Sequence, residues 1–301
     1  MGKIIIVGLG NMGLSHLRSF LKSKLKFRIF IVEKDKKRVE EVKKIFIKEK
    51  VKNFYLDHKV PKSEIFDFAI ISTRPKERLQ VIKELLLRNR VKILFLEKFL
   101  FCKIENYRKF SRFYRNKVNY AYVNIWSEIF LKLLKIKKNK TPFIINVTLP
   151  EKRILTNVIH FYEIFRILSG EKFKINFEKL IIYKKIDGYH EGTGKIEFSK
   201  NNSKMIIKTK KMENTFIFNY QSKHFLKTVK FKKGNIVDLI NKDKKIKFPL
   251  ASSVTCKFYE KVINNKNRKN ISFPKYELVE KSSKRILNIL NNHFKKKIFI
   301  L

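Results

Sequence analysis

The sequence contains few cysteines, few glycines and prolines, and few acidic residues. Its two cysteines, Cys102 and Cys256, have no paired spacing. This argues against a disulfide framework or a zinc site and is typical of a reducing cytoplasm. No apolar run approaches the roughly 20 residues that a membrane-spanning helix needs. We therefore expect a cytoplasmic protein with no membrane partner and no bound metal.

Acidic residues are outnumbered: Lys and Arg total 71 against 26 Asp and Glu, a net charge of +45. Such a balance suggests nucleic-acid binding. However, the lysines are spread along the whole chain, and we find no nucleic-acid-binding motif. Lys, Ile, Phe and Asn are enriched whereas Gly (9) and Pro (6) are scarce, a bias that follows codons rich in A and T. We interpret the charge as compositional drift and expect no specific nucleic-acid partner; a nucleic-acid-associated protein is the less favoured alternative.

The most informative stretch is residues 3–33. An apolar run, 3–7, predicts a buried strand, and a second, 27–32, ends at Glu33, about twenty residues after a G-x-G-x-x-G. That motif consists of Gly8, Leu9, Gly10, Asn11, Met12 and Gly13. Its glycines permit a tight turn, close approach to a pyrophosphate, and helix–strand packing, while Glu33 can accept hydrogen bonds from a ribose. The pattern predicts a dinucleotide-binding domain; the alternative is a Gly-rich turn in another α/β fold.

Strand and helix patterns alternate over residues 1–122, which predicts a parallel, doubly wound α/β sheet. Helices are expected over 35–50, from Pro75 and over 105–116, and strands over 54–56, 67–73, 93–96 and 120–125.

Residues 123–301 change character and predict a second α/β domain with an open-faced mixed or antiparallel sheet. An amphipathic helix is expected over 154–168, and helices after Pro249 and Pro274. Strands are expected over 177–183, 194–198, 205–209, 216–220 and 228–231, with turns at 200–203 and 233–235.

Four motifs together resemble one family in their order and spacing. They are the glycine motif 8–13 followed by Ser15-His16, then Ser72-Thr73-Arg74-Pro75, Leu96-Glu97-Lys98, and His160 to Gly170. In these the chain resembles the glucose–fructose oxidoreductase/inositol dehydrogenase (Gfo/Idh/MocA) family along nearly its whole length. The resemblance implies an N-terminal Rossmann domain, a C-terminal α/β domain with an open-faced sheet, and hydride transfer between NAD(H) or NADP(H) and a hydroxyl carbon of a sugar or related molecule.

The resemblance also implies a set of site residues. Lys98 would be the acid/base on the reacting hydroxyl and His160 would relay or orient the proton; the alternatives are an ordinary strand-end lysine and a helix-packing histidine. Expected substrate-binding residues are Lys98, Asn124, Asn157, His160 and Glu163. Expected cofactor-binding residues are Gly8, Leu9, Gly10, Asn11, Met12, Gly13, Glu33, Thr73, Arg74 and Glu97. We expect NAD in preference to NADP, because Glu33 would repel a 2′-phosphate, although Lys34 could offset this.

Three positions depart from the family pattern. Phe99 replaces the proline after Lys98, Asn157 (or Thr156) replaces an acid upstream of His160, and Arg78 replaces a histidine. Because Asn157 cannot act as a base, a degenerate cofactor-binding member without significant catalysis remains an alternative. Phe99 predicts a trans peptide bond after Lys98.

The second half is also expected to pair subunits. In the family's architecture one face of the open sheet is uncovered, and Ile181, Ile206 and Phe216 are expected there. Such a patch is too large for a monomer, so the sequence predicts a homodimer or homotetramer.

Overall fold

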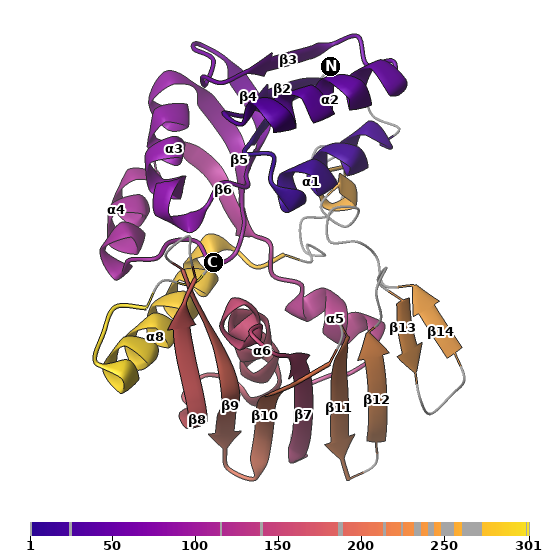
Figure 1. Cartoon of the computed structure of the whole chain (residues 1–301), viewed down its shortest axis with the longest axis vertical. Coiled ribbons are helices and arrows are strands. Elements are labelled where there is room, and N and C mark those ends of the chain that lie inside the picture. The colour runs from indigo at the N-terminus through magenta and orange to yellow at the C-terminus, as the bar shows by residue number, and fades with distance from the viewer. Residues whose placement is uncertain are drawn as a thin grey trace. The chain divides into compact units, whose positions relative to one another are not determined.

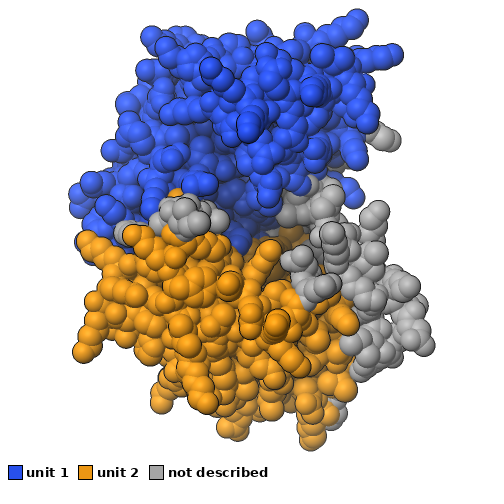
Figure 2. Space-filling model, viewed as in Figure 1, with its two compact units in different colours: residues 1–125, 251–287 blue, residues 126–250, 288–301 orange. Residues whose placement is uncertain are grey.

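The computed structural model describes residues 2–23, 26–114, 116–138, 141–185, 189–212, 215–223, 225–231, 236–239, 244–247, 256–260, 273–298 and 300 (Figure 1). Contacts group the chain into two compact units (Figure 2). The first is Met1–Ile125 with Ala251–Leu287, and the second is Trp126–Leu250 with Asn288–Leu301. Residues 123–125 and 251–287 group with the first unit, whereas the sequence predicted that all residues after 122 form the second domain.

The first unit contains a six-stranded sheet, all parallel, in the order β3-β2-β1-β4-β5-β6. This confirms the predicted doubly wound sheet. Its strands are β1 (Gly2–Val7), β2 (Phe27–Val32), β3 (Phe54–Asp57), β4 (Ile65–Ile71), β5 (Arg90–Leu96) and β6 (Val118–Val123). Its helices include α1 (Asn11–Leu21), α2 (Lys36–Lys48), α3 (Pro75–Arg88) and α4 (Ile104–Tyr114).

Local sequence explains these elements. The central strands are apolar on both faces, as in β1, where consecutive residues 4–6 are fully buried; buried parallel strands require this. Helix α2 begins after Asp35, whose side chain accepts a hydrogen bond from the Lys37 N–H at 2.8 Å. Helix α3 begins at Pro75, where a proline costs no hydrogen bond.

Two late segments belong to the first unit. In the described part 256–260, which is helical, the ring of Tyr259 contacts Phe20 and Phe68. Helix α8 (Tyr276–Phe294) confirms the helix predicted after Pro274, and its residues from 288 onward belong to the second unit. The rest of the helix predicted after Pro249 and the turn predicted at 233–235 lie outside the described residues.

The second unit contains an eight-stranded mixed sheet in the order β14-β13-β12-β11-β7-β10-β9-β8. Only β7 and β10 pair in parallel. Its strands are β7 (Phe143–Pro150), β8 (Lys174–Lys184), β9 (His190–Lys200), β10 (Ser203–Lys210), β11 (Phe216–Ser222), β12 (Phe225–Phe231), β13 (Ile236–Leu239) and β14 (Lys244–Lys247). Its other helices include α5 (Ser127–Leu133) and α6 (Ile154–Ser169). Helix α5 and strands β7, β13 and β14 were not predicted from the sequence.

Helices α5 and α6 pack on one face of this sheet, where Phe130 contacts Phe218 and Phe165 contacts Phe198. The opposite face carries the alternate residues. Ile206 lies there because its neighbours in β10 are buried on the helix side, and Ile181, 66% exposed, lies there as well. The expectation that Phe216 lies on this face was wrong. It shares the parity of Phe218 and stacks on Phe231 at 3.8 Å between ring centroids.

Helix α6 also differs from expectation. The sequence predicted an amphipathic helix, but eleven of its residues are buried, and they occur on every side of the helix. Its interior therefore accommodates two polar side chains, His160 and Glu163, both almost fully buried. None of the helices formed by the described residues is long and apolar enough to cross a membrane.

Candidate functional site

The glycine motif joins β1 to α1. A side chain has no room at Gly8 or Gly13 but has room at Gly10. Gly8 has φ +88°, and a Cβ there would lie 2.9 Å from the Thr73 nitrogen. A Cβ on Gly13 would lie 2.0 Å from the Gly8 oxygen, whereas a Cβ on Gly10 would have no atom within 4 Å. No side chain caps the start of α1. The loop therefore leaves space and helix N–H groups where a pyrophosphate binds in Rossmann folds, so these residues fit a dinucleotide.

Glu33 follows β2 and binds the glycine loop. One carboxylate oxygen accepts a hydrogen bond from the Leu9 N–H, and the other accepts from the N–H groups of Lys34 at 2.7 Å and Asp35 at 2.9 Å. The side chain is half-buried. Glu33 therefore connects the β1–α1 and β2–α2 loops. The ribose contact expected from the sequence stays a prediction.

The loops after β1, β4, β5 and β6 lie side by side along the carboxyl edge of the sheet. The Ser72 N–H donates to the Val7 carbonyl, and the Asn124 N–H donates to the Leu96 carbonyl, both at 2.8 Å. Thr73 lies beside Gly8, and Arg74 is exposed at the start of α3. In open α/β sheets, ligands bind at this edge.

A buried polar cluster lies at the end of β5. Glu97 accepts hydrogen bonds from Asn124 and pairs with His16, both at 2.8 Å. Burial alone would raise the pKa of Glu97, but His16, Asn124 and Arg78 outweigh it, so the pKa is lowered and the carboxylate is ionised at neutral pH. The Oδ1 atom of Asn124 is buried and has no hydrogen-bond partner among the residues described. Glu97 and Asn124 were expected from the sequence as site residues, whereas His16 was only part of the motif that follows the glycine loop.

Lys98 is the one residue of 97–101 that is not buried. The peptide bonds of the described segments include no cis form, so the Lys98–Phe99 bond is trans, as predicted. The loop's carbonyl groups converge on Arg78, which is 2% exposed. Its Nη1 atom lies within hydrogen-bond distance of the carbonyl oxygens of Glu97, Phe99 and Leu100, and Nη2 donates to Thr73. From the sequence, Arg78 was only a departure from the family pattern, with no role assigned to it.

His160 lies in the second unit, near the middle of α6. Its ring stacks on Trp126 with centroids 4.4 Å apart, and its carbonyl accepts a hydrogen bond from Ser127 at 2.7 Å. The imidazole is 2% exposed. Trp126 was not singled out from the sequence.

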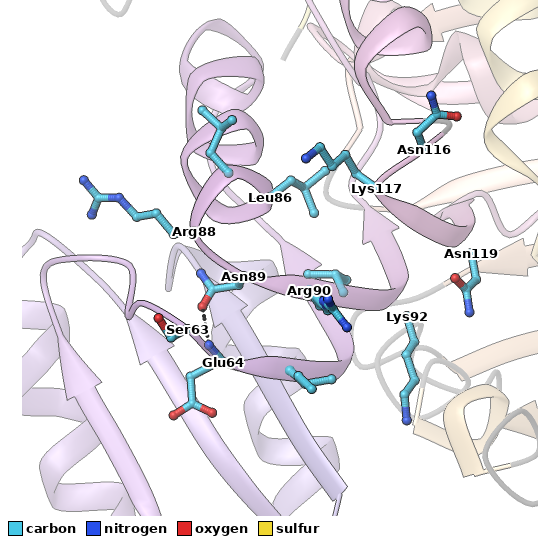
Figure 3. A pocket seen from close by; sticks show the side chains of 13 residues that line it. Ser63, Glu64, Leu86, Arg88, Asn89, Arg90, Lys92, Asn116, Lys117 and Asn119 are labelled. Atoms are coloured by element: carbon cyan, nitrogen blue, oxygen red, sulfur yellow. Dashed lines mark hydrogen bonds between the residues drawn. The ribbon is translucent and has the colours of Figure 1, made fainter.

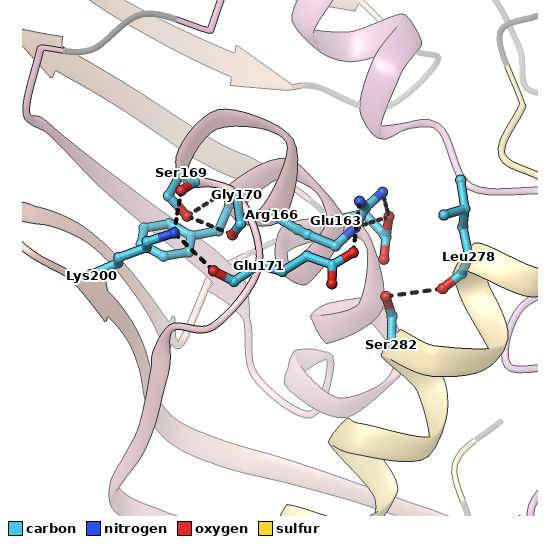
Figure 4. Close-up of polar contacts among 9 residues, drawn as sticks. Glu163, Arg166, Ser169, Gly170, Glu171, Lys200, Leu278 and Ser282 are labelled. Atoms are coloured by element: carbon cyan, nitrogen blue, oxygen red, sulfur yellow. Dashed lines mark hydrogen bonds and ion pairs between the residues drawn. The ribbon is translucent and has the colours of Figure 1, made fainter.

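The two polar neighbours of His160 on α6 have separate partners. Glu163 accepts two hydrogen bonds from Arg166, at 2.8 and 3.0 Å (Figure 4). Burial alone would lower the pKa of Arg166, but Glu163 and Glu171 raise it overall. Asn157 donates to the Arg153 carbonyl at 2.8 Å, at the start of the helix. Asn157, His160 and Glu163 thus lie on one helix, but each contacts a different residue: Arg153, Trp126 and Arg166, respectively.

A hollow of about 770 Å³ lies at the opposite edge of the first sheet, among the amino ends of β4, β5 and β6 (Figure 3). Its lining includes Arg88, Arg90, Lys92 and Lys117. Asn89 lies there too, but its side chain is bonded to the backbone of Glu64, Pro61 and Leu85. This hollow is separate from the glycine loop. In the described segments, no three His, Cys, Asp or Glu side chains are grouped as a metal site would require.

No family model and no curated protein matches this sequence, but many solved structures match its fold. An oxidoreductase from Agrobacterium radiobacter, solved with NAD+, L-tartaric acid and magnesium, has a TM-score of 0.63 at 12% identity, covering 94% of this chain and 93% of that chain. Biliverdin reductase from Synechocystis sp. PCC 6803, solved with biliverdin and NADP+, has a TM-score of 0.63 at 11% identity, covering 96% and 98%. A super-repressor mutant of Gal80p from Saccharomyces cerevisiae has a TM-score of 0.66 at 13% identity, covering 99% and 97%. The chain has the fold of the Gfo/Idh/MocA-type oxidoreductases.

Proposed function

We propose that this protein is an NAD(P)-dependent oxidoreductase that transfers a hydride between a nicotinamide cofactor and a hydroxyl carbon of a sugar or nucleotide sugar. The observation that carries the proposal is the carboxyl edge of the first sheet. There an open glycine loop follows β1, and Lys98, the one residue of 97–101 that is not buried, follows β5 of the same sheet. Ligands bind at this edge in such folds, and a lysine there can exchange a proton with a substrate hydroxyl.

The cofactor side of the proposal rests on the glycine loop and Glu33. The N–H groups at the start of α1 bind the pyrophosphate, and Gly10 leaves room for it. Glu33 accepts from the ribose hydroxyls and disfavours a 2′-phosphate, so NAD(H) binds more tightly than NADP(H). When bound, the nicotinamide supplies the hydride acceptor or donor.

The chain's own residues supply the proton chemistry. Lys98 Nζ takes the proton from the substrate hydroxyl during oxidation and returns it during reduction. Glu97 does not titrate with it, because its carboxylate is buried and bonded to His16 and Asn124. We assign His160 to orienting or relaying that proton, with Asn157 and Glu163 as further substrate-binding candidates. Asn124, whose side chain donates to Glu97 at 2.8 Å, is a further candidate for substrate binding.

The test begins with fluorescence titration of NADH and NADPH, followed by turnover on a panel of sugars and nucleotide sugars. Lys98→Ala should lower kcat by about 10³-fold while cofactor affinity changes less than about twofold, because a proton-transfer group acts mainly in the transition state. Lys92→Ala is the matched control: Lys92 lies near the start of β5, the strand that Lys98 follows, and pairs with Asp67 at 2.7 Å. Failure to bind either cofactor, or full activity of Lys98→Ala, would overturn the proposal.

A second candidate is a cofactor-binding protein without significant catalysis. Two observations favour it: Asn157, which cannot act as a base, is engaged at the start of α6, and one structure with this fold is named as a super-repressor. Tight NADH binding with no turnover across the panel would select this second candidate.

A further inference from the structure

We propose that Arg78 is a positioning residue: it holds the loop 97–101 so that Lys98 points out of an otherwise buried segment. The inference rests on the proposed function, because it assigns Arg78 a role in the turnover attributed to Lys98. Arg78 itself acts through the loop's backbone.

The geometry supports this assignment. Nη1 of Arg78 lies 2.5 Å from the Phe99 carbonyl oxygen, 3.2 Å from that of Leu100, and within hydrogen-bond distance of that of Glu97. These carbonyls flank Lys98 on both sides. Nη2 donates to the Thr73 carbonyl at 2.5 Å, so one guanidinium joins the β4–α3 loop to the β5–α4 loop. A planar guanidinium with five donors can hold several acceptors at once, which an ammonium cannot do in the same geometry.

Arg78 is itself held firmly. It lies in the first turn of α3, where its N–H donates to the Arg74 carbonyl at 3.1 Å. The same helix buries Leu79, Ile82 and Leu85. The helix therefore serves as a fixed platform for the guanidinium, and the loop is ordered relative to it.

The other side chains of the loop cannot replace this contact. Phe99, Leu100 and Phe101 are all buried, which anchors the segment but leaves its carbonyl groups in need of donors. The charge of Arg78 is compensated by the neighbouring Glu97 carboxylate, which it helps to keep ionised. Removing the guanidinium leaves buried carbonyl groups without donors and frees the backbone on both sides of Lys98.

The test uses Arg78→Lys and Arg78→Met in the full chain. We expect hydrogen exchange to accelerate in peptides covering 97–101 but not in those covering the glycine loop. On a substrate found with the wild-type protein, kcat should fall by about 10- to 100-fold in Arg78→Met, with cofactor affinity nearly unchanged, because small misplacement of a reacting group is costly. Arg78→Lys retains the charge and part of the donor set. Its kcat and its exchange rate at 97–101 should therefore lie between those of the wild-type protein and Arg78→Met.

Leu85→Ala is the matched control, since it removes a buried side chain from the same helix, seven residues after Arg78. It should lower stability but leave kcat per folded molecule and exchange at 97–101 unchanged. Wild-type kcat in Arg78→Met, or faster exchange spread equally over the first unit, would overturn the inference. If Arg78→Met does not fold, Arg78→Lys decides by the same two readouts. If the wild-type protein has no activity, the proposed function fails on its own, and the exchange data still decide whether Arg78 orders the loop.

Discussion

The two sheets of this molecule are built from opposite burial patterns. The central strands of the first sheet are runs of consecutive buried residues, such as 4–6 in β1 and 68–71 in β4. Strands of the second sheet alternate, as in β7, where every second residue is buried. A sheet of the first kind is covered on both faces, so its ligands bind at the ends of its strands. A sheet of the second kind packs one face against the core, and its other face can contact solvent or another subunit.

The same difference separates the candidate site residues. Those of the first unit follow strands and are joined by backbone hydrogen bonds between adjacent loops. Those of the second unit lie on one helix, α6, and bond to side chains or backbone of that helix or stack on Trp126. The candidate residues of the first unit are therefore fixed by contacts between loops, whereas those of the second unit are fixed by contacts within α6 or with Trp126.

The largest effect is expected at the closed end of the glycine loop. Gly13→Ala places a Cβ 2.0 Å from the Gly8 oxygen, so the backbone must move. We expect a loss of roughly 3 kcal/mol in the free energy of unfolding, measured by urea denaturation, and loss of NADH binding.

Gly10→Ala is the matched control, because its Cβ meets nothing within 4 Å. It should cost less than about 1 kcal/mol in stability but weaken NADH binding tenfold or more, because the methyl group occupies the approach of the pyrophosphate. Equal losses of stability in the two variants would contradict this prediction, because they would show that the loop has no more space for a side chain at Gly10 than at Gly13.

A smaller effect is expected on the face of the second sheet opposite helices α5 and α6, where we predict self-association. Ile206 lies on that face, opposite Glu197 of β9 and Asn146 of β7. Ile206→Lys should weaken the homodimer or homotetramer by about 2 kcal/mol of association free energy, the value of one buried aliphatic side chain, with the fold intact because Glu197 can pair with the new charge. Sedimentation at micromolar concentration measures this.

Ile47→Lys is the control for that variant, since Ile47 is 77% exposed in the first unit. If the wild-type protein sediments as a monomer, the second sheet does not mediate self-association. The difference in burial pattern between the two sheets would then not reflect an interface between subunits.

The sequence predicted those features whose signals are local. Consecutive apolar residues, the glycine spacing, the helical spacing over 35–50 and Pro75 at a helix start predicted most of the strands and helices of the first unit. Strand β7 carried a comparable signal, with Phe143, Ile145 and Val147 alternating, but its parallel partner β10 lies about sixty residues later. Contacts between distant positions could not be predicted from the sequence. His16 and Glu97, for example, are 81 residues apart. The role proposed for Arg78 depends on backbone carbonyl groups, which every residue has and which therefore leave no signal in the sequence.

The smallest effect is expected at Glu33, which decides between the two cofactors. Its carboxylate is fixed by the N–H groups of Leu9, Lys34 and Asp35, so it cannot move away from a 2′-phosphate without breaking those bonds. Glu33→Ser should reduce the preference for NADH over NADPH by about tenfold, or about 1.4 kcal/mol. Part of the change comes from weaker NADH binding, because Leu9 and the ribose lose an acceptor.

Calorimetric titration at moderate and high salt measures this preference and separates local repulsion from the general positive field, which salt screens. Glu49→Ser is the control: it removes one acid just after α2 and changes the net charge by the same amount as Glu33→Ser. If the wild-type protein binds NADPH as tightly as NADH at both salt concentrations, the +45 charge outweighs a single fixed carboxylate, and Glu33 serves the glycine loop rather than cofactor choice.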